Sequence, residues 1–132
     1  MSAVLDASAL LAYVRDEPGA EAVDRALEEG AYVSAANWAE ALSKIAERGQ
    51  APEDTVRALT DAGILGESLI VHPLDEAQAV EIARLRPLTR EAGLSLADRA
   101  CLALATTLGS PALTADGAWV ELYVGPRIEL IR

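Results

Sequence analysis

The sequence contains no phenylalanine, a single cysteine, Cys101, and a single histidine, His72. One cysteine excludes an intramolecular disulfide, which is typical of proteins that work in a reducing cytoplasm. One histidine without a nearby cysteine argues against a zinc site, because structural zinc takes four such ligands. Since aromatic residues make up only 4% of the chain and hydrophobic residues 52%, we expect Ala, Leu and Val to build the core.

Long apolar runs are also missing. No stretch approaches the ~20 residues that a membrane helix needs, and no basic segment followed by an apolar one opens the chain. We therefore expect a cytoplasmic protein that does not contact a membrane. The 132 residues suit a single domain over residues 1–132, which is large enough to fold without disulfides.

Positive charge is scarce in this chain. Eleven Lys and Arg residues stand against 21 Asp and Glu, which gives a net charge of −10 at pH 7. A nucleic-acid-binding protein usually carries a basic footprint, so this balance is mild evidence against RNA binding. It suggests instead a basic partner, a metal site or simple solubility. The densest basic region, either a local RNA-facing patch or a solvated helix face, comprises Arg84, Arg86, Arg90 and Arg99.

Short strand-like runs alternate with longer helix-like runs along the sequence. Strands are predicted at residues 1–6, 31–34, 69–72, 111–114 and 128–131. Helices are predicted at residues 8–15, 19–29, 37–48, 52–63, 75–85 or beyond, 95–108 and 118–123. This order predicts an α/β fold of three layers, with a mostly parallel central sheet of four to five strands and helices on both faces.

Several residues predict where these helices begin or bend. Asn37, Asp75 and Ser95 are each expected to cap a helix, because their side chains can accept hydrogen bonds from the first helical N–H groups. Pro87 is expected to kink the helix that begins at residue 75, because proline lacks the N–H that an α-helix needs. Cys101 lies in an apolar helical run, which is typical of a small core residue.

Four acids are predicted to lie at one edge of the sheet. Asp6 and Asp116 follow the first and fourth strands, while Glu40 and Asp98 lie near the start of helices. Ligands of such folds bind outside the carboxyl ends of the strands. Each acid alone is explained as a turn, a cap or a complement to the helix dipole. Together, carboxylates in largely apolar surroundings would repel each other unless they share a cation.

A hard divalent cation, Mg²⁺ or Mn²⁺, would remove the repulsion among these four acids. Such an ion takes oxygen ligands, polarises a phosphate and lowers the pKa of a bound water. The chemistry that follows is phosphodiester hydrolysis by a metal-activated water. Ser8 and Thr114 lie at the same predicted edge, where their hydroxyls either orient a carboxylate, a water or a phosphate, or act as local caps.

Four segments of the sequence resemble the PIN-domain ribonucleases, in particular the VapC-type toxins. They are residues 4–12, 37–41, 94–105 and 113–119, in the family's order and over nearly the whole chain. The resemblance implies a Mg²⁺- or Mn²⁺-dependent endoribonuclease that forms a homodimer and is held inactive by a cognate antitoxin. It assigns the metal-binding, catalytic positions to Asp6, Glu40, Asp98 and Asp116, and the supporting hydroxyls to Ser8 and Thr114. Gly117 departs from the family, where relatives often carry a basic or bulkier residue.

For three apolar residues and two tryptophans, the sequence allows more than one interpretation. Leu10, Leu11 and Val14 of the first helix either line an antitoxin groove or pack into the core. Trp38 and Trp119 each lie near a proposed acid, and either stack on a base or pack in the core or at a dimer face.

Other acidic α/β proteins fit the sequence less well. A receiver domain needs a second acid after Asp6, where this chain has Ala7, and a late lysine, whereas the only lysine is Lys44. A phosphatase of the Asp-x-Asp type needs an acid where Ser8 stands. Dinucleotide binding lacks its G-x-G-x-x-G motif after the first strand. The alternative that stays open is a non-catalytic PIN-like module that binds protein or RNA through a degenerate site.

Overall fold

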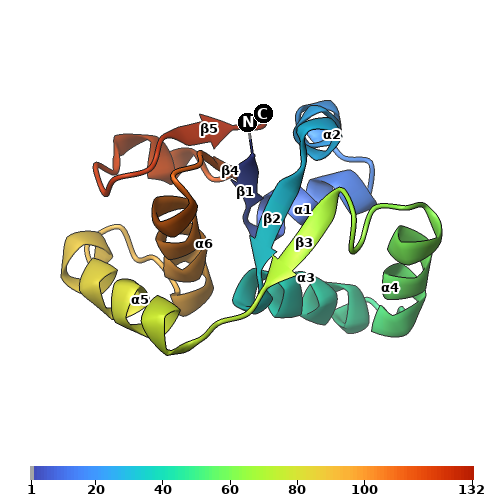
Figure 1. Cartoon of the computed structure of the whole chain (residues 1–132), viewed down its shortest axis with the longest axis horizontal. Coiled ribbons are helices and arrows are strands. Elements are labelled where there is room, and N and C mark those ends of the chain that lie inside the picture. The colour runs from blue at the N-terminus through green and yellow to red at the C-terminus, as the bar shows by residue number, and fades with distance from the viewer. Residues whose placement is uncertain (1) are drawn as a thin grey trace.

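The computed structural model describes residues 2–132 and has the alternating strands and helices that the sequence predicts (Figure 1). Met1, the first residue of the first predicted strand, lies outside the described residues. The strands are β1 (Ala3–Leu5), β2 (Ala31–Ser34), β3 (Leu69–His72), β4 (Ala112–Thr114) and β5 (Ile128–Leu130). The helices are α1 (Ala7–Val14), α2 (Ala20–Glu29), α3 (Ala35–Glu47), α4 (Pro52–Asp61), α5 (Glu76–Thr89) and α6 (Leu96–Leu108), with a 3₁₀ helix η1 (Gly117–Glu121).

All five strands are parallel and lie in the order β3-β2-β1-β4-β5. The chain moves outward from β1 through β2 to β3, then returns to place β4 and β5 on the other side of β1. The strand order therefore reverses between β1 and β4, and a reversal of this kind opens a crevice at the carboxyl ends of the strands. The predicted fold class is confirmed, with every paired strand parallel.

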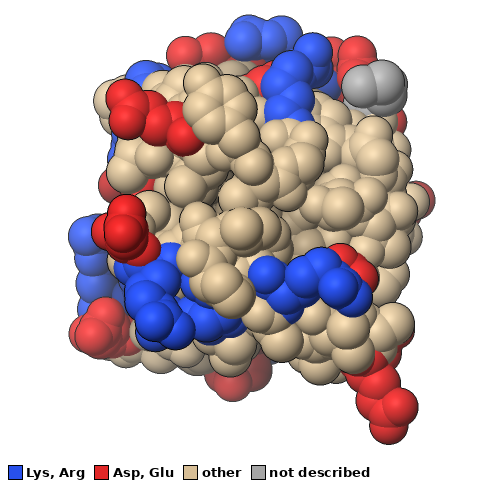
Figure 2. Space-filling view, turned by 90° about the vertical axis from the view of Figure 1, so that its left-hand side faces the viewer, with Lys and Arg blue, Asp and Glu red and all other residues tan. Residues whose placement is uncertain are grey.

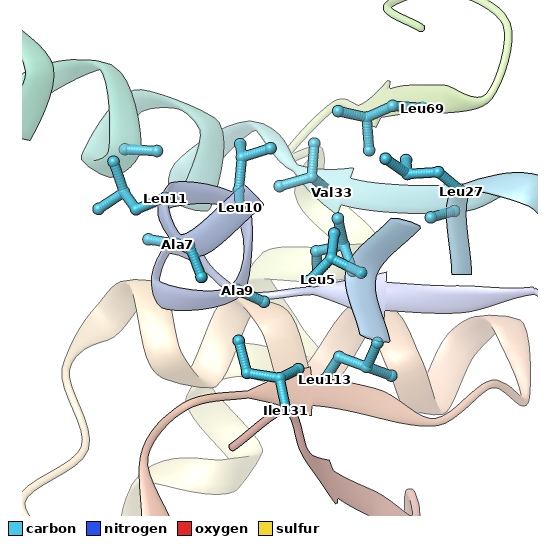
Figure 3. Close-up of a cluster of buried hydrophobic side chains, with 14 of the residues drawn as sticks. Leu5, Ala7, Ala9, Leu10, Leu11, Leu27, Val33, Leu69, Leu113 and Ile131 are labelled. Carbon is cyan, nitrogen blue, oxygen red and sulfur yellow. The ribbon is translucent and has the colours of Figure 1, made fainter. Parts of the chain in front are cut away.

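Two apolar cores cover the two faces of the sheet. Side chains alternate between faces along a strand, so Leu5 joins one core and Val4 the other. The first core packs against α1, α2 and α3, and Figure 3 shows Leu10, Val33 and Leu69 meeting there. The second packs against α5 and α6 and includes the fully buried Trp119. The three predicted layers are therefore present.

Several expectations about single residues are settled by these cores. Leu10 and Leu11 are buried, so they belong to the core, whereas Val14 is only half-buried. Cys101 is fully buried as expected, and burial raises the pKa of its thiol well above the ordinary value. Trp119 packs inside the protein, and Trp38 lies partly buried against the first core.

The start of α3 corrects one prediction. Asn37 does not cap this helix; Ser34 does, and its hydroxyl accepts a hydrogen bond from the backbone N–H of Ala36. Ser34 ends β2 and opens α3 without an intervening loop, so the helix begins earlier than the sequence suggested. The other two caps, Asp75 and Ser95, are confirmed, and α5 continues through Pro87 to its last residue. Within residues 2–132, none of the helices has the length and hydrophobicity that a membrane span requires.

Candidate active site

Asp6 lies at the carboxyl end of β1 and is the N-cap of α1. Its Oδ1 accepts hydrogen bonds from the Ala9 N–H at 2.8 Å and from the Ser8 hydroxyl at 2.7 Å. Its Oδ2 accepts from the Thr114 hydroxyl at 2.5 Å. The residue is only 4% exposed. Three donors from two elements therefore hold this carboxylate in one orientation.

The electrostatic surroundings of Asp6 leave its charge uncompensated. Burial raises the pKa of Asp6, the hydrogen bonds from Thr114, Ala9 and Ser8 act to lower it, and the charge of Asp98 raises it again. Among residues 2–132, no Lys or Arg side chain forms an ion pair with Asp6. A cation beside this carboxylate would favour its charged form, which is what a buried acid without a basic partner needs.

Two hydroxyls join the ends of β1 and β4. The Thr114 hydroxyl donates to Asp6 and accepts a hydrogen bond from the Asp116 N–H at 3.0 Å. The Ser8 hydroxyl donates to Asp6 and accepts from the Ala115 N–H at 2.9 Å. The two hydroxyl oxygens lie 3.4 Å apart. Both therefore orient the Asp6 carboxylate and tie it to the segment that carries Asp116.

Asp98 lies in the first turn of α6, where it forms a capping box with Ser95. The Ser95 hydroxyl accepts from the Asp98 N–H at 3.1 Å, and Asp98 Oδ2 accepts from the Ser95 N–H at 2.9 Å. Asp98 is half-buried, and its charge contributes to raising the pKa of Asp6. These two carboxylates therefore lie within each other's electrostatic field.

Asp116 and Glu40 complete the predicted set. Asp116 is exposed and caps η1, since its Oδ1 accepts from the Ala118 N–H at 2.9 Å. The exposed Gly117 begins that 3₁₀ helix. Glu40 is half-buried on α3, and within the described part of the chain it forms neither a hydrogen bond nor an ion pair. Hydrogen bonds through Thr114 thus link Asp6 to Asp116, and Asp98 is related to Asp6 through its charge alone. Glu40 is placed only by its helix.

The donor set suits a hard, hydrated cation. In the conformation described for residues 2–132, no three Asp, Glu, His or Cys side chains are grouped to hold one ion. Within these residues, Asp98 and Asp116 each use one carboxylate oxygen in a helix-capping hydrogen bond, and the other oxygen of each accepts none. Mg²⁺ keeps several waters and is often held by only one or two carboxylates. The carboxylate and hydroxyl oxygens of this region therefore match the ligand type that such an ion prefers.

Asn37 is a residue of this region whose place the sequence interpretation missed. It is fully buried on α3, where its Oδ1 accepts from the Ala7 N–H at 3.3 Å and its Nδ2 donates to the Ala97 carbonyl at 3.0 Å. The signal was present in the sequence. Asn37, Ala41 and Ile45 recur every four residues and form the buried face of α3.

The four predicted RNA-contacting arginines separate into two kinds. Arg84 and Arg86 are exposed on α5, and Arg90 is exposed directly after the last residue of that helix. Figure 2 shows the side of the molecule that is on the left in Figure 1, with Lys and Arg side chains in a band across its lower part. Arg84 lies 3.7 Å from Glu81, its partner in an ion pair. Arg99 is half-buried and donates to the Ile82 carbonyl at 3.1 Å, so it connects α6 to α5.

A hollow that none of the four acids lines lies between the end of α1 and the helices α3 and α4. This groove has a volume of about 1310 Å³. Val14, Ile45 and Leu59 contribute apolar lining, and Arg48 and Asp54 contribute charges of both signs. Of the apolar strip predicted on the first helix, only Val14 lines it.

Comparison with known families matches residues 3–124 to the family described as PIN domain. By sequence search, no curated protein matches this chain. Among solved structures, a chain of a toxin–antitoxin complex from Klebsiella pneumoniae is similar over 99% of this chain and 98% of its own, with 19% identity and a TM-score of 0.71. A chain of DNA-bound VapBC from Salmonella typhimurium matches over 100% and 99%, with 18% identity and a TM-score of 0.74. VapC20 of Mycobacterium tuberculosis, described as a sarcin–ricin loop cleaving toxin, matches over 88% and 91%, with 15% identity and a TM-score of 0.67.

Proposed function

The chain belongs to the PIN-domain family, and from that premise we propose that it is a metal-dependent endoribonuclease, the VapC-type toxin of a toxin–antitoxin pair. One observation carries the proposal. The carboxylate of Asp6 is buried at the switch point of a parallel sheet, fixed by three donors, and paired with no cation in residues 2–132. A buried charge kept at such a cost to stability is typical of a functional site.

In this proposal, Asp6, Glu40, Asp98 and Asp116 hold Mg²⁺ or Mn²⁺. When bound, such an ion polarises a phosphate oxygen and makes an attacking water more acidic. The chain itself supplies the orientation. Ser8 and Thr114 direct both oxygens of Asp6, while Asp98 and Asp116 each keep one oxygen to which no group in residues 2–132 donates. We assign these four acids as catalytic and the two hydroxyls as their supports.

The substrate in this proposal is single-stranded RNA. A protein with a net charge of −10 needs a local basic surface to approach a phosphate backbone. The exposed Arg84 and Arg86 of α5, with Arg90 at its C-cap, supply one, and we assign the phosphate contacts to them. Arg99 has its guanidinium bonded to the backbone of α5, so we assign it a mainly structural part.

An antitoxin is the proposed protein partner, and we place it in the groove beside α4. The mixed lining of this groove suits an amphipathic helix, which would lay its apolar face on Val14 and Leu59. The acidic chain favours a partner with basic residues. We further propose that the toxin is a cytoplasmic homodimer. The toxin–antitoxin complexes that share this fold support an antitoxin as partner.

Cleavage of RNA tests the catalytic proposal. Purified protein freed of any bound partner is incubated with a mixed pool of single-stranded RNA, with Mg²⁺ or Mn²⁺ and with EDTA. We expect cleavage that EDTA abolishes, that Asp98→Asn abolishes, and that Asp61→Asn, a change of an exposed acid on α4, leaves intact. If metal-loaded wild-type protein leaves the RNA pool whole, the chain is a non-catalytic PIN-like binding module instead.

A pair of substitutions on α4 tests the antitoxin groove. Ala58 is exposed and lines the groove, whereas Ala62 is exposed at the end of the same helix and does not line it. We expect Ala58→Arg to abolish co-purification of the small partner from the native host, and Ala62→Arg to preserve it. Equal retention by the two variants would place the partner elsewhere.

A further inference from the structure

We infer that Asn37 is a positioning residue for the metal-binding carboxylates, because its buried amide joins the segments that carry three of them. The inference rests on the proposed metal-dependent function and adds a residue that the acidic set does not include. Asn37 is 0% exposed, so no solvent water replaces its hydrogen bonds.

The amide of Asn37 connects three elements. From α3, its Oδ1 accepts the Ala7 N–H at the start of α1, and its Nδ2 donates to the Ala97 carbonyl in the first turn of α6. The Ala7 N–H belongs to the first turn of a helix, where no helical carbonyl is available to accept it. Figure 1 shows α3 lying across the end towards which β2 and β3 point, which is where these segments meet.

The two residues that hydrogen-bond to Asn37 are each next in sequence to a proposed metal ligand. Ala7 follows Asp6 directly, and Ala97 directly precedes Asp98. Glu40 lies three residues after Asn37 on α3, so the two are neighbours on the helix surface. The side chain of Asn37 therefore holds the backbone next to three carboxylates. Asp6 and Asp98 are each one residue from a backbone group that it binds, and Glu40 is about one helical turn from Asn37 itself. Displacements of about 1 Å in such sites cost on the order of 100-fold in rate.

The chemistry of the amide explains why asparagine is suited to this position. One planar group must accept from an N–H and donate to a carbonyl at the same time, without adding charge. Aspartate would keep the acceptor but lose the donor, and would add a further negative charge near Asp6. Serine carries one hydroxyl on a shorter side chain and can satisfy only one of the two backbone groups.

Gln78 provides a matched control. It is also a buried amide, 6% exposed, and its Nε2 donates to the Thr107 hydroxyl at 2.8 Å. Like Asn37, it links another helix to α6, but at the opposite end of α6 from Asp98. Substituting either residue by alanine removes a buried hydrogen bond between helices, and only Asn37→Ala releases the segments that carry the acids.

The preference for Mg²⁺ over Ca²⁺ distinguishes a positioning role of Asn37 from a general effect on stability. Mg²⁺ demands near-ideal octahedral geometry, whereas Ca²⁺ accepts variable geometry and ligand number. We would titrate wild type, Asn37→Ala, Asn37→Ser and Gln78→Ala with Mg²⁺ and with Ca²⁺ by calorimetry, below the melting temperature of each protein. We expect Asn37→Ala to weaken Mg²⁺ binding by about 10- to 100-fold, as loss of an outer-shell residue does. Binding of Ca²⁺ should weaken less, and Gln78→Ala should bind both ions as wild type does.

The outcomes separate this inference from the proposed function. If wild type binds neither ion, the proposed function fails and the role of Asn37 with it. If wild type binds Mg²⁺ and the folded Asn37→Ala protein binds it equally well, or loses the same factor for both ions, only the positioning role is overturned. Should Asn37→Ala fail to fold, Asn37→Ser decides, with an intermediate loss of Mg²⁺ affinity expected and wild-type affinity overturning the inference.

Discussion

Replacing Thr114 by valine removes one hydroxyl from the centre of the site with almost no change in shape. That hydroxyl donates to the Asp6 carboxylate at 2.5 Å and accepts the Asp116 N–H at 3.0 Å. A hydrogen bond to a charged group contributes about 1.5–3 kcal/mol, and a partly buried N–H left without an acceptor adds about 1 kcal/mol. We therefore expect Thr114→Val to lower the free energy of unfolding of the metal-free protein by about 2.5–4 kcal/mol at neutral pH.

The destabilisation caused by Thr114→Val should depend on pH. Burial raises the pKa of Asp6, and the bond from Thr114 is the strongest of the hydrogen bonds that lower it. Removing the hydroxyl therefore raises the folded-state pKa of Asp6 further, so the variant is penalised most where Asp6 is ionised. As the pH falls through the folded-state pKa, Asp6 takes up a proton and the difference from wild type shrinks.

Urea denaturation in EDTA, repeated across a pH series, measures this destabilisation. Thr60→Val is the control, because the Thr60 hydroxyl donates to the Val56 carbonyl on an exposed face of α4 and, within residues 2–132, donates to no carboxylate. In Thr60→Val the free energy of unfolding should fall by no more than about 0.5 kcal/mol, and this change should not vary with pH. A cost for Thr114→Val as small as that of the control, or one that is the same at every pH, would refute the assigned role of this hydroxyl.

Further predictions concern the acid and the arginines. Asp6→Asn should raise the melting temperature of the EDTA-treated protein at neutral pH, because burial raises the pKa of Asp6 and its charge therefore opposes folding above about pH 4. Added Mg²⁺ should then stabilise wild type but not Asp6→Asn. If the substitution lowers the melting temperature of the EDTA-treated protein, the charge of Asp6 does not oppose folding. The double variant Arg86→Ala, Arg90→Ala should weaken RNA binding by an inactive Asp98→Asn protein. It should also reduce the salt slope by about 0.7 for each phosphate that the protein no longer neutralises. Arg57→Ala, at an exposed residue of α4, should leave both the RNA affinity and its salt slope unchanged in filter binding.

Elements with complete local signals were predictable from the sequence. Strands β2 and β3 were predicted at their observed bounds, and α6 runs from its predicted Ser95 cap to the residue before Gly109. Gly109 has a φ of 62°, a left-handed conformation that glycine adopts without strain. In contrast, the start of α3 was misplaced because Ser34 and Asn37 are both good capping residues. Local preference could not choose between them, whereas packing buries Asn37.

The site was predictable as a location but not as a set of contacts. The carboxyl ends of parallel strands meet at one edge, so the positions of Asp6 and Asp116 follow from the order of the elements. The bonds of Asn37 do not, because they join residues 30 and 60 positions away in the chain. No periodicity of a single segment contains that information.

The local and functional explanations of the acids do not compete. Asp98 accepts the Ser95 N–H with Oδ2 in the capping box of α6, and Asp116 caps η1 with Oδ1. Within residues 2–132, each therefore still has one oxygen without a protein donor. Helix capping thus orients the same carboxylates that we propose as ligands. The amide oxygen of an asparagine at this position can still accept the Ser95 N–H. Asp98→Asn should therefore keep the fold of α6 while it removes a charge, which makes it the sharper test of catalysis. Alanine at this position would lose both roles at once and leave the result ambiguous.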